Sequence, residues 1–162
     1  MSKHTLSVLV ENKPGVLARI AGLFARRGFN IETLTVGPTD NEQFSRITLT
    51  VDGALHPIDQ VTKQLHKLVN VLKIRDLEPA GTVTRELALF KIAAEAQARS
   101  EILEFVGIFR ARVLDTTKRS VTVEVTGDSE KIDAFEMVVR PYGLIEMMRT
   151  GEIAMSRGRS ET

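Results

Sequence analysis

The sequence predicts an α+β protein in which a strand–helix–strand–strand–helix–strand order occurs twice. Apolar residues alternate along some segments, which is typical of half-buried strands, and recur every three or four residues along others, which is typical of amphipathic helices. The 162 residues, 43% of them hydrophobic, suffice for two small cores. With right-handed crossovers each half closes into a ferredoxin-like (βαββαβ) sandwich, an antiparallel sheet with two helices on one face. We expect domains at residues 1–78 and 82–155, followed by a flexible polar tail at 156–162.

The first half begins with an alternating segment at residues 4–10. Helical spacing follows from Pro14 to Arg27, and Gly28 provides a C-terminal cap. The turn-rich stretch 38–42 joins the second and third strands as a hairpin. The expected strands cover about residues 4–10, 31–36, 46–51 and 71–77, and the expected helices cover about residues 14–27 and 57–69. The side chains expected to be buried by the second helix are Ile58, Val61, Leu65, Leu68 and Val69.

The second half repeats this order of elements without repeating the residues. A short linker at 78–81 precedes a long strand over about 82–93 and a helix from about Ser100. Asp128 and Ser129 can cap a second helix, which Pro141–Gly143 should end. The remaining expected strands lie near 113–116, at 121–125 and from about 144. The inner faces of the two helices are expected to be Ile102, Leu103, Val106 and Phe109, and Ile132, Phe135, Val138 and Val139.

The composition excludes several functional classes. Without cysteine there is no disulfide, thiolate metal site or cysteine nucleophile. His4, His56 and His66 share no metal-ligand spacing with carboxylates, and His66 is expected to face solvent. No phosphate-binding loop, nucleophile elbow or dinucleotide fingerprint occurs, so we expect neither a catalytic residue nor a metal site. A net charge of +1 and 5% aromatic residues argue against nucleic-acid binding. No apolar run approaches the roughly 20 residues of a membrane span, and we expect a cytoplasmic protein.

The junction between the first strand and the first helix, Glu11–Leu17, is a candidate binding site. Asn12 can act as a cap or turn former, and Pro14 suits a helix start because no amide hydrogen is needed there. Gly15 has no Cβ, so a ligand can approach the backbone closely. The first amides of a helix lie at its positive end without internal partners, and they can receive a carboxylate. A plain turn that binds no ligand is the alternative reading of these residues.

The second strand is predicted to lie at an edge of the first sheet. It contains no proline before Pro38, and an unprotected edge strand invites pairing with another copy. Two copies joined through this strand would form an eight-stranded sheet. Asn30 of the second copy would then come near Gly15 of the first. We therefore expect a homodimer through the N-terminal domain.

Several segments together resemble a known family. Leu6–Leu17 (LSVLVENKPGVL) resembles the opening of ACT regulatory domains. Arg26–Leu34 (RRGFNIETL), whose RGFNIE core is the most specific part, and Lys63–Leu68 (KQLHKL) narrow the resemblance. With Thr84–Leu89 (TRELAL) and Ser156–Gly158 (SRG), essentially the whole chain resembles the small regulatory subunits of acetohydroxyacid (acetolactate) synthase.

The resemblance implies a chain with no active site of its own, whose residues 1–78 form an ACT domain for ligand binding and dimerisation. Such a chain binds the large catalytic subunit, raises its activity and confers feedback inhibition by valine or another branched-chain amino acid. Thiamine diphosphate, Mg and FAD are then expected in that partner, and no cofactor is expected in this chain. Lys13 stands where relatives often carry an acidic or neutral residue. The ligand-binding positions carried over are Asn12, Gly15, Val16 and Leu17 from one chain, with Asn30 and Ile31 from the other.

The chemistry of these positions suits a small amino acid. The amides of Gly15 and Val16 would receive the carboxylate, and carbonyl oxygens of the two asparagines would accept from the ammonium group. Leu17 and Ile31 would line an apolar slot, where one methylene changes affinity by only ~1 kcal/mol. Weak discrimination among valine, leucine and isoleucine is therefore expected.

Two alternatives remain at this point. A free-standing ACT sensor of a different amino-acid pathway would share the ligand site but would not co-purify with a thiamine-dependent subunit. A nucleic-acid-binding module with the same fold would show salt-dependent binding. The C-terminal domain is expected to tune sensitivity or to contact the catalytic chain.

Overall fold

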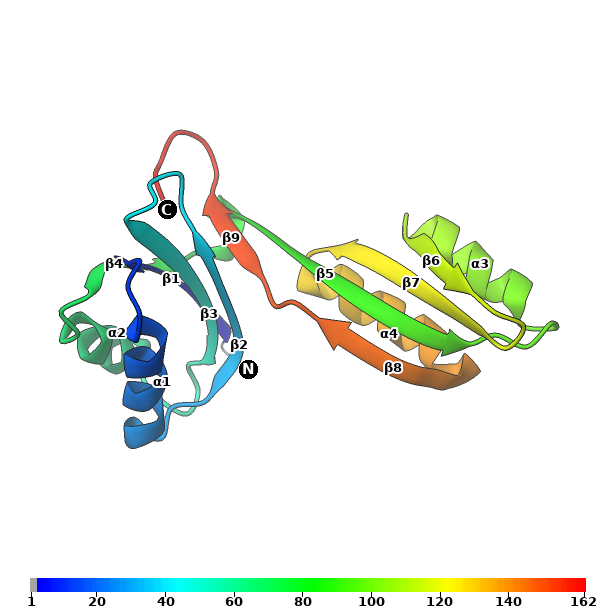
Figure 1. Cartoon of the computed structure of the whole chain (residues 1–162), viewed down its shortest axis with the longest axis horizontal. Coiled ribbons are helices and arrows are strands. Elements are labelled where there is room, and N and C mark those ends of the chain that lie inside the picture. The colour runs from blue at the N-terminus through cyan, green and yellow to red at the C-terminus, as the bar shows by residue number, and fades with distance from the viewer. Residues whose placement is uncertain (1–2) are drawn as a thin grey trace. The chain divides into compact units, whose positions relative to one another are not determined.

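The computed structural model describes residues 3–162, which form two compact units (Figure 1). The first unit contains the chain up to Val83 and, in addition, Glu152–Thr162. The second unit contains Thr84–Gly151. The chain therefore leaves the first unit once and returns to it.

The first unit has the predicted ferredoxin-like topology. Its sheet has the strand order β2-β3-β1-β4 with antiparallel pairing throughout, and α1 and α2 cover one face (Figure 1). The strand β2 therefore lies at an edge, as predicted. The elements are β1 (Lys3–Glu11), α1 (Val16–Arg27), β2 (Ile31–Pro38), β3 (Phe44–Asp52), α2 (Ile58–His66) and β4 (Val71–Leu77).

The core of the first unit lies between this sheet and the two helices. Alternate residues of β1 and β3 point toward the helices, while the residues between them lie on the opposite face. The helices bury residues at helical spacing, which explains why the sequence pattern located both elements correctly. The buried side chains include Leu6, Val8, Val10, Ile20, Phe24, Ile47, Leu49, Val51, Val61 and Leu65.

The second unit repeats the topology with the strand order β6-β7-β5-β8, and β9 pairs with β5. Its core is centred on Phe135, whose ring makes edge contacts with Phe90 at 5.0 Å and Phe109 at 5.3 Å between ring centroids. Asp128 caps α4 as predicted, because its Oδ1 accepts the Lys131 amide at 2.9 Å. After the 3-10 helix η1 (Pro79–Gly81), the elements are β5 (Thr82–Ala93), α3 (Arg99–Ile108), β6 (Arg112–Thr116), β7 (Ser120–Gly127), α4 (Ser129–Gly143) and β8 (Leu144–Arg149). The last strand, β9 (Ile153–Ser156), belongs to the first unit.

Several sequence predictions are corrected by the structure. The first helix begins at Val16 rather than Pro14, because Gly15 adopts a left-handed conformation that cannot continue a helix. The second helix ends at His66, and Val69 is 86% exposed rather than buried. Leu103 is also exposed. By contrast, α4 ends at Gly143 as predicted, with Pro141 in its last turn. A proline in the last turn interrupts a helix less than one at its centre, because few turns follow it.

The polar tail is also different from the prediction. Residues 153–156 form β9, and the stretch predicted to be frayed at 156–162 makes contacts with the first unit. The sequence pattern could not reveal this, because the contacts are made by backbone atoms of the tail. These contacts are described in detail below.

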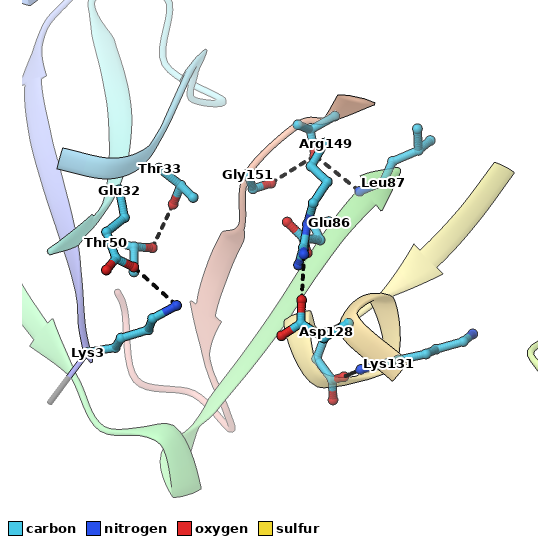
Figure 2. A network of polar contacts seen from close by, with 12 residues as sticks. Lys3, Glu32, Thr33, Thr50, Glu86, Leu87, Asp128, Lys131, Arg149 and Gly151 are labelled. Atoms are coloured by element: carbon cyan, nitrogen blue, oxygen red, sulfur yellow. Dashed lines mark hydrogen bonds and ion pairs between the residues drawn. The ribbon is translucent and has the colours of Figure 1, made fainter. Parts of the chain in front are cut away.

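A buried ion pair joins β5 to β8 in the second unit. Figure 2 shows Arg149 directed at Glu86, and the Arg149 Nε atom donates to Glu86 Oε1 at 3.0 Å. A further guanidinium nitrogen bonds the same carboxylate, and another bonds Asp133 of α4. Burial alone would lower the pKa of Arg149, but its hydrogen bonds to both carboxylates raise it above the ordinary value. The side chain of Glu86 is only 2% exposed, so the pair is an integral part of the fold.

Glu86→Gln should therefore destabilise the second unit. The substitution removes the charge that compensates a partly buried guanidinium, and we expect a loss of about 2–3 kcal/mol in the free energy of unfolding. The matched control is Glu146→Gln, because Glu146 forms an ion pair with Lys91 at the surface, at 3.2 Å. That change should cost less than ~0.5 kcal/mol. Urea unfolding followed by circular dichroism measures both, and equal effects would contradict a structural role for Glu86.

Candidate functional site

The connection between β1 and α1 forms a tight and open turn, called the 12–17 turn below. Gly15 has a φ angle of 86°, in the left-handed region that favours glycine. No atom lies within 4 Å of the position that a Cβ would occupy there. Pro14 and Gly15 therefore produce a turn whose backbone is accessible to a ligand from outside.

The amides at the start of α1 remain available as donors. No side chain caps the helix, and its first internal hydrogen bond is donated by the Arg19 amide to the Gly15 carbonyl at 3.0 Å. The Val16 amide makes only a long contact of 3.5 Å with the Lys13 carbonyl. Across residues 3–162, the amides of Leu17 and Ala18 have no acceptor. These donors lie at the positive end of the helix and can receive an anion.

Asn12 holds the turn to the hairpin between β2 and β3. Its backbone amide donates to the Gln43 carbonyl at 2.8 Å, and its side-chain Nδ2 donates to the Glu42 carbonyl at 3.0 Å. The side chain therefore does not cap α1, although the sequence allowed that role. These two bonds fix one side of the turn to the start of β3.

A polar network around Asn70 holds the other side of the turn. The Asn70 side chain donates to Glu11 Oε2 at 3.2 Å and accepts from Arg19 Nη1 at 2.6 Å, so it bridges the end of β1 and the first turn of α1. Lys13 completes the network through an ion pair with Glu11 at 2.8 Å. The hydrogen bonds from Lys13 and then Asn70 lower the pKa of Glu11 below its ordinary value of 4.5.

Sequence reasoning missed the part played by Asn70 and Arg19. The two residues are 51 positions apart in the chain, and only the fold brings the connection before β4 next to α1. Neither residue belongs to a motif that the sequence presents. No signal in a single sequence could have identified this pair.

An apolar surface lies beside the free amides. The Val16 side chain is buried in the core, so only its backbone can contribute to a site. The Leu17 side chain is 42% exposed, and Val36 on the edge strand β2 is 43% exposed. The turn thus combines donors for an anion with an accessible apolar side chain.

Asn30 and Ile31 lie at the opposite end of the sheet from the 12–17 turn. Ile31 pairs with Val51 near the end of β3, whereas Glu11 pairs with Phe44 at its start. One chain therefore brings together four of the six predicted site residues and leaves these two apart. Their contribution from a second copy stays a prediction.

The remaining candidates do not form a site of their own. His66 is exposed, as predicted. His4 pairs with Asp76 at 2.9 Å, and His56 Nε2 lies 3.2 Å from the Gly28 carbonyl. In the described residues 3–162, no three histidine or acidic side chains gather in a way that could hold a metal ion. Within the same residues, none of the helices has the length and apolar character needed to cross a bilayer.

Two protein-family models match this chain, one in each half. Residues 6–73 match the model of the AHAS small subunit-like ACT domain. Residues 85–158 match the model described as the small subunit of acetolactate synthase. The first match contains the 12–17 turn, and together the two cover nearly the whole chain.

Similar proteins agree with these matches. The probable acetolactate synthase small subunit of Methanothermobacter thermautotrophicus is 54% identical over 156 residues, covering 96% of this chain and 93% of the relative. The acetolactate synthase small subunit of Mycobacterium leprae is 54% identical over 155 residues, covering 96% and 92%. The crystal structure of the Thermotoga maritima small subunit matches with a TM-score of 0.88 at 38% identity, over 99% of this chain and 100% of that one. The chain therefore belongs to the family of acetolactate synthase small subunits, and its N-terminal unit is an ACT domain of that family.

Proposed function

We propose that this chain is the regulatory, non-catalytic subunit of acetolactate synthase. In this role it binds the large catalytic subunit, raises its activity and makes the enzyme sensitive to feedback inhibition by valine or another branched-chain amino acid. Membership of the small-subunit family across nearly the full length supports the regulatory role. The catalytic subunit would hold the thiamine diphosphate, Mg and FAD.

The observation that carries ligand binding is the open turn at Gly15. The unpaired amides at the start of α1 would receive the carboxylate of the amino acid. The exposed Leu17 side chain would contact its aliphatic part. The carbonyl oxygens near Asn12 would accept hydrogen bonds from the ammonium group.

The edge position of β2 supports a homodimer that completes this site. If two copies pair antiparallel through β2, the start of one strand lies beside the end of the other. Asn30 and Ile31 of the second copy would then lie next to Val36–Pro38 of the first. That end of β2 leads directly into the hairpin that holds Asn12. The ligand would therefore contact both copies.

Inhibition would then follow from linkage between ligand binding and the dimer arrangement. An amino acid held by residues of both copies favours the arrangement in which those residues are close. The catalytic subunit would respond to that arrangement, and a coupling of ~1–3 kcal/mol changes affinity about 5–150-fold. No catalytic group of this chain takes part in the mechanism.

Co-purification and calorimetry test the proposal. The chain should co-purify with the thiamine-dependent large subunit, and titration with valine, leucine and isoleucine should show binding with modest differences among the three. Added valine should lower the activity of the complex. Amino-acid binding without association with the large subunit would instead indicate a free-standing sensor, and binding of none of the three would overturn the ligand site.

A further inference from the structure

The face of the first sheet opposite α1 and α2, called the far face below, is polar and yet buried. Ser7 on β1 and Thr48 on β3 lie opposite each other in the register of this face. Their exposed fractions are only 2% and 4%. One face of a two-layer sandwich ordinarily meets water, so the burial of these hydroxyl groups indicates a covering segment.

The end of the chain makes contacts with this face. The chain returns to the first unit at Glu152, just before β9, and the end marked C lies in that unit in Figure 1. Arg46 on β3 donates from Nη1 to Ser7 Oγ at 2.8 Å and to the Thr162 main-chain oxygen at 3.0 Å. Arg75 on β4, which lies opposite Ser7 in register, donates to the Glu161 carbonyl. Two arginines of the sheet therefore hold the main-chain oxygen atoms of two consecutive residues of the tail.

Hydrogen bonds within the tail close it into a defined loop. The Ser156 amide donates to Thr162 Oγ1 at 2.8 Å, and the Arg157 amide donates to the Gly81 carbonyl at 2.9 Å. Thr162 itself is buried. The side chains between these anchor points, from Arg157 to Glu161, are exposed. The sheet therefore recognises this segment by its main chain rather than by its side chains.

We propose that the far face is a binding site for a peptide loop, recognised through the main-chain oxygen atoms of two consecutive residues, and that residues 157–162 occupy it in cis. These residues are called the closing segment below. Arg46 and Arg75 are its anchors, because a guanidinium group presents several donors in a fixed geometry to carbonyl oxygens. In the sequence, the whole second unit separates residues 1–83 of the first unit from the closing segment. The contact therefore joins two parts of the first unit that are far apart in the chain.

The closing segment is attached near Ser7 at the centre of β1, because Arg46 donates to Ser7 and Arg75 lies opposite it in register. The backbone of Arg46 lies nearer the end of the sheet that carries the 12–17 turn. Arg46 pairs with Leu9 of β1, two positions before the pairing of Glu11 with Phe44. The neighbouring carbonyls at 42–43 hold Asn12. The segment therefore stabilises the start of β3 from the far face. The carbonyls just before β3 hold the 12–17 turn at the same time. We expect this support to increase the affinity of the turn for its ligand. That expectation, called the coupling below, rests on the proposed function, whereas occupancy of the far face by the closing segment does not.

Hydrogen exchange of the full chain tests the occupancy. Arg46→Met removes one anchor, and the Ser156 amide, whose acceptor belongs to Thr162, should then exchange about tenfold faster or more. The buried Leu49 amide at the centre of β3 should change by less than twofold. Arg27→Met, at an exposed position in the last turn of α1, is the matched control and should affect neither amide. Arg46→Lys, which keeps a cationic donor, should restore part of the protection.

Two results would overturn the occupancy of the site. Unchanged exchange at Ser156 in Arg46→Met would mean that the anchor does not hold the segment. Equal acceleration at Ser156 and Leu49 would mean that Arg46 stabilises the whole unit rather than the segment.

Calorimetric titration of valine into the same variants tests the coupling separately. If the wild-type chain binds valine, Arg46→Met should bind it several-fold more weakly. Unchanged affinity together with faster exchange at Ser156 would overturn the coupling. Absence of valine binding by the wild-type chain would overturn the proposed function, while the exchange result would still stand.

Discussion

Gly15→Asp should leave activation of the catalytic subunit intact and abolish inhibition by valine. The new carboxylate would lie at the free amides of α1, where the carboxylate of the amino acid is expected. Two like charges about 4 Å apart repel by about 4 kcal/mol at an effective dielectric constant near 20, which corresponds to roughly a thousandfold loss of affinity. Calorimetry and valine inhibition of the reconstituted enzyme measure this loss.

Gly15→Asn is the matched control for charge. Asparagine has nearly the same shape, and it tolerates a left-handed conformation better than most residues. No atom lies within 4 Å of the Cβ position at Gly15, and both side chains share the strain of its positive φ angle. The asparagine variant should therefore keep more of the valine response than the aspartate variant. Equal loss in both variants would show that charge at this turn is unimportant, and unchanged inhibition in Gly15→Asp would remove the site altogether.

Val36→Lys should convert the proposed dimer into a monomer and, with it, remove the proposed valine response. Val36 is 43% exposed near the end of the edge strand β2, where the proposed pairing places the second copy. A lysine there would bury an unpaired ammonium group in the interface, at a cost of several kcal/mol. We expect the dimer dissociation constant to rise by about 100-fold or more. Sedimentation velocity over a range of concentrations measures this change.

The opposite edge of the same sheet offers the control. Leu72 on β4 is 46% exposed, so Leu72→Lys adds the same charge at a similar exposure without touching β2. This variant should remain a dimer and keep its valine response. If Leu72→Lys dissociates the dimer and Val36→Lys does not, the two copies meet through β4. A wild-type chain that is monomeric at all concentrations would exclude both arrangements.

The sequence was sufficient for the topology because both units follow local rules. Alternation in β1 and β3 and helical spacing in α1 reflect burial on one side of each element, and a pattern of this kind is visible without the fold. Local rules failed at the ends of elements and for single residues on a helix face. The helix start at Val16 depended on the φ angle of Gly15, and the burial expected of Leu103 was not realised. The spacing of apolar residues predicts which face of a helix or strand is buried. It does not predict how much of each side chain on that face is covered.

The sequence by itself determined the repeated βαββαβ order, the edge position of β2 and the glycine turn before α1, together with the family to which these residues belong. Only the tertiary structure decided how the turn is held, because Asn70 and Arg19 meet through the folding of distant segments. It also decided that the tail belongs to the first unit, where Arg46 donates to the Thr162 main-chain oxygen. Periodic side-chain burial leaves a record in the sequence, whereas a hydrogen bond to a backbone carbonyl can be made to almost any residue and leaves none.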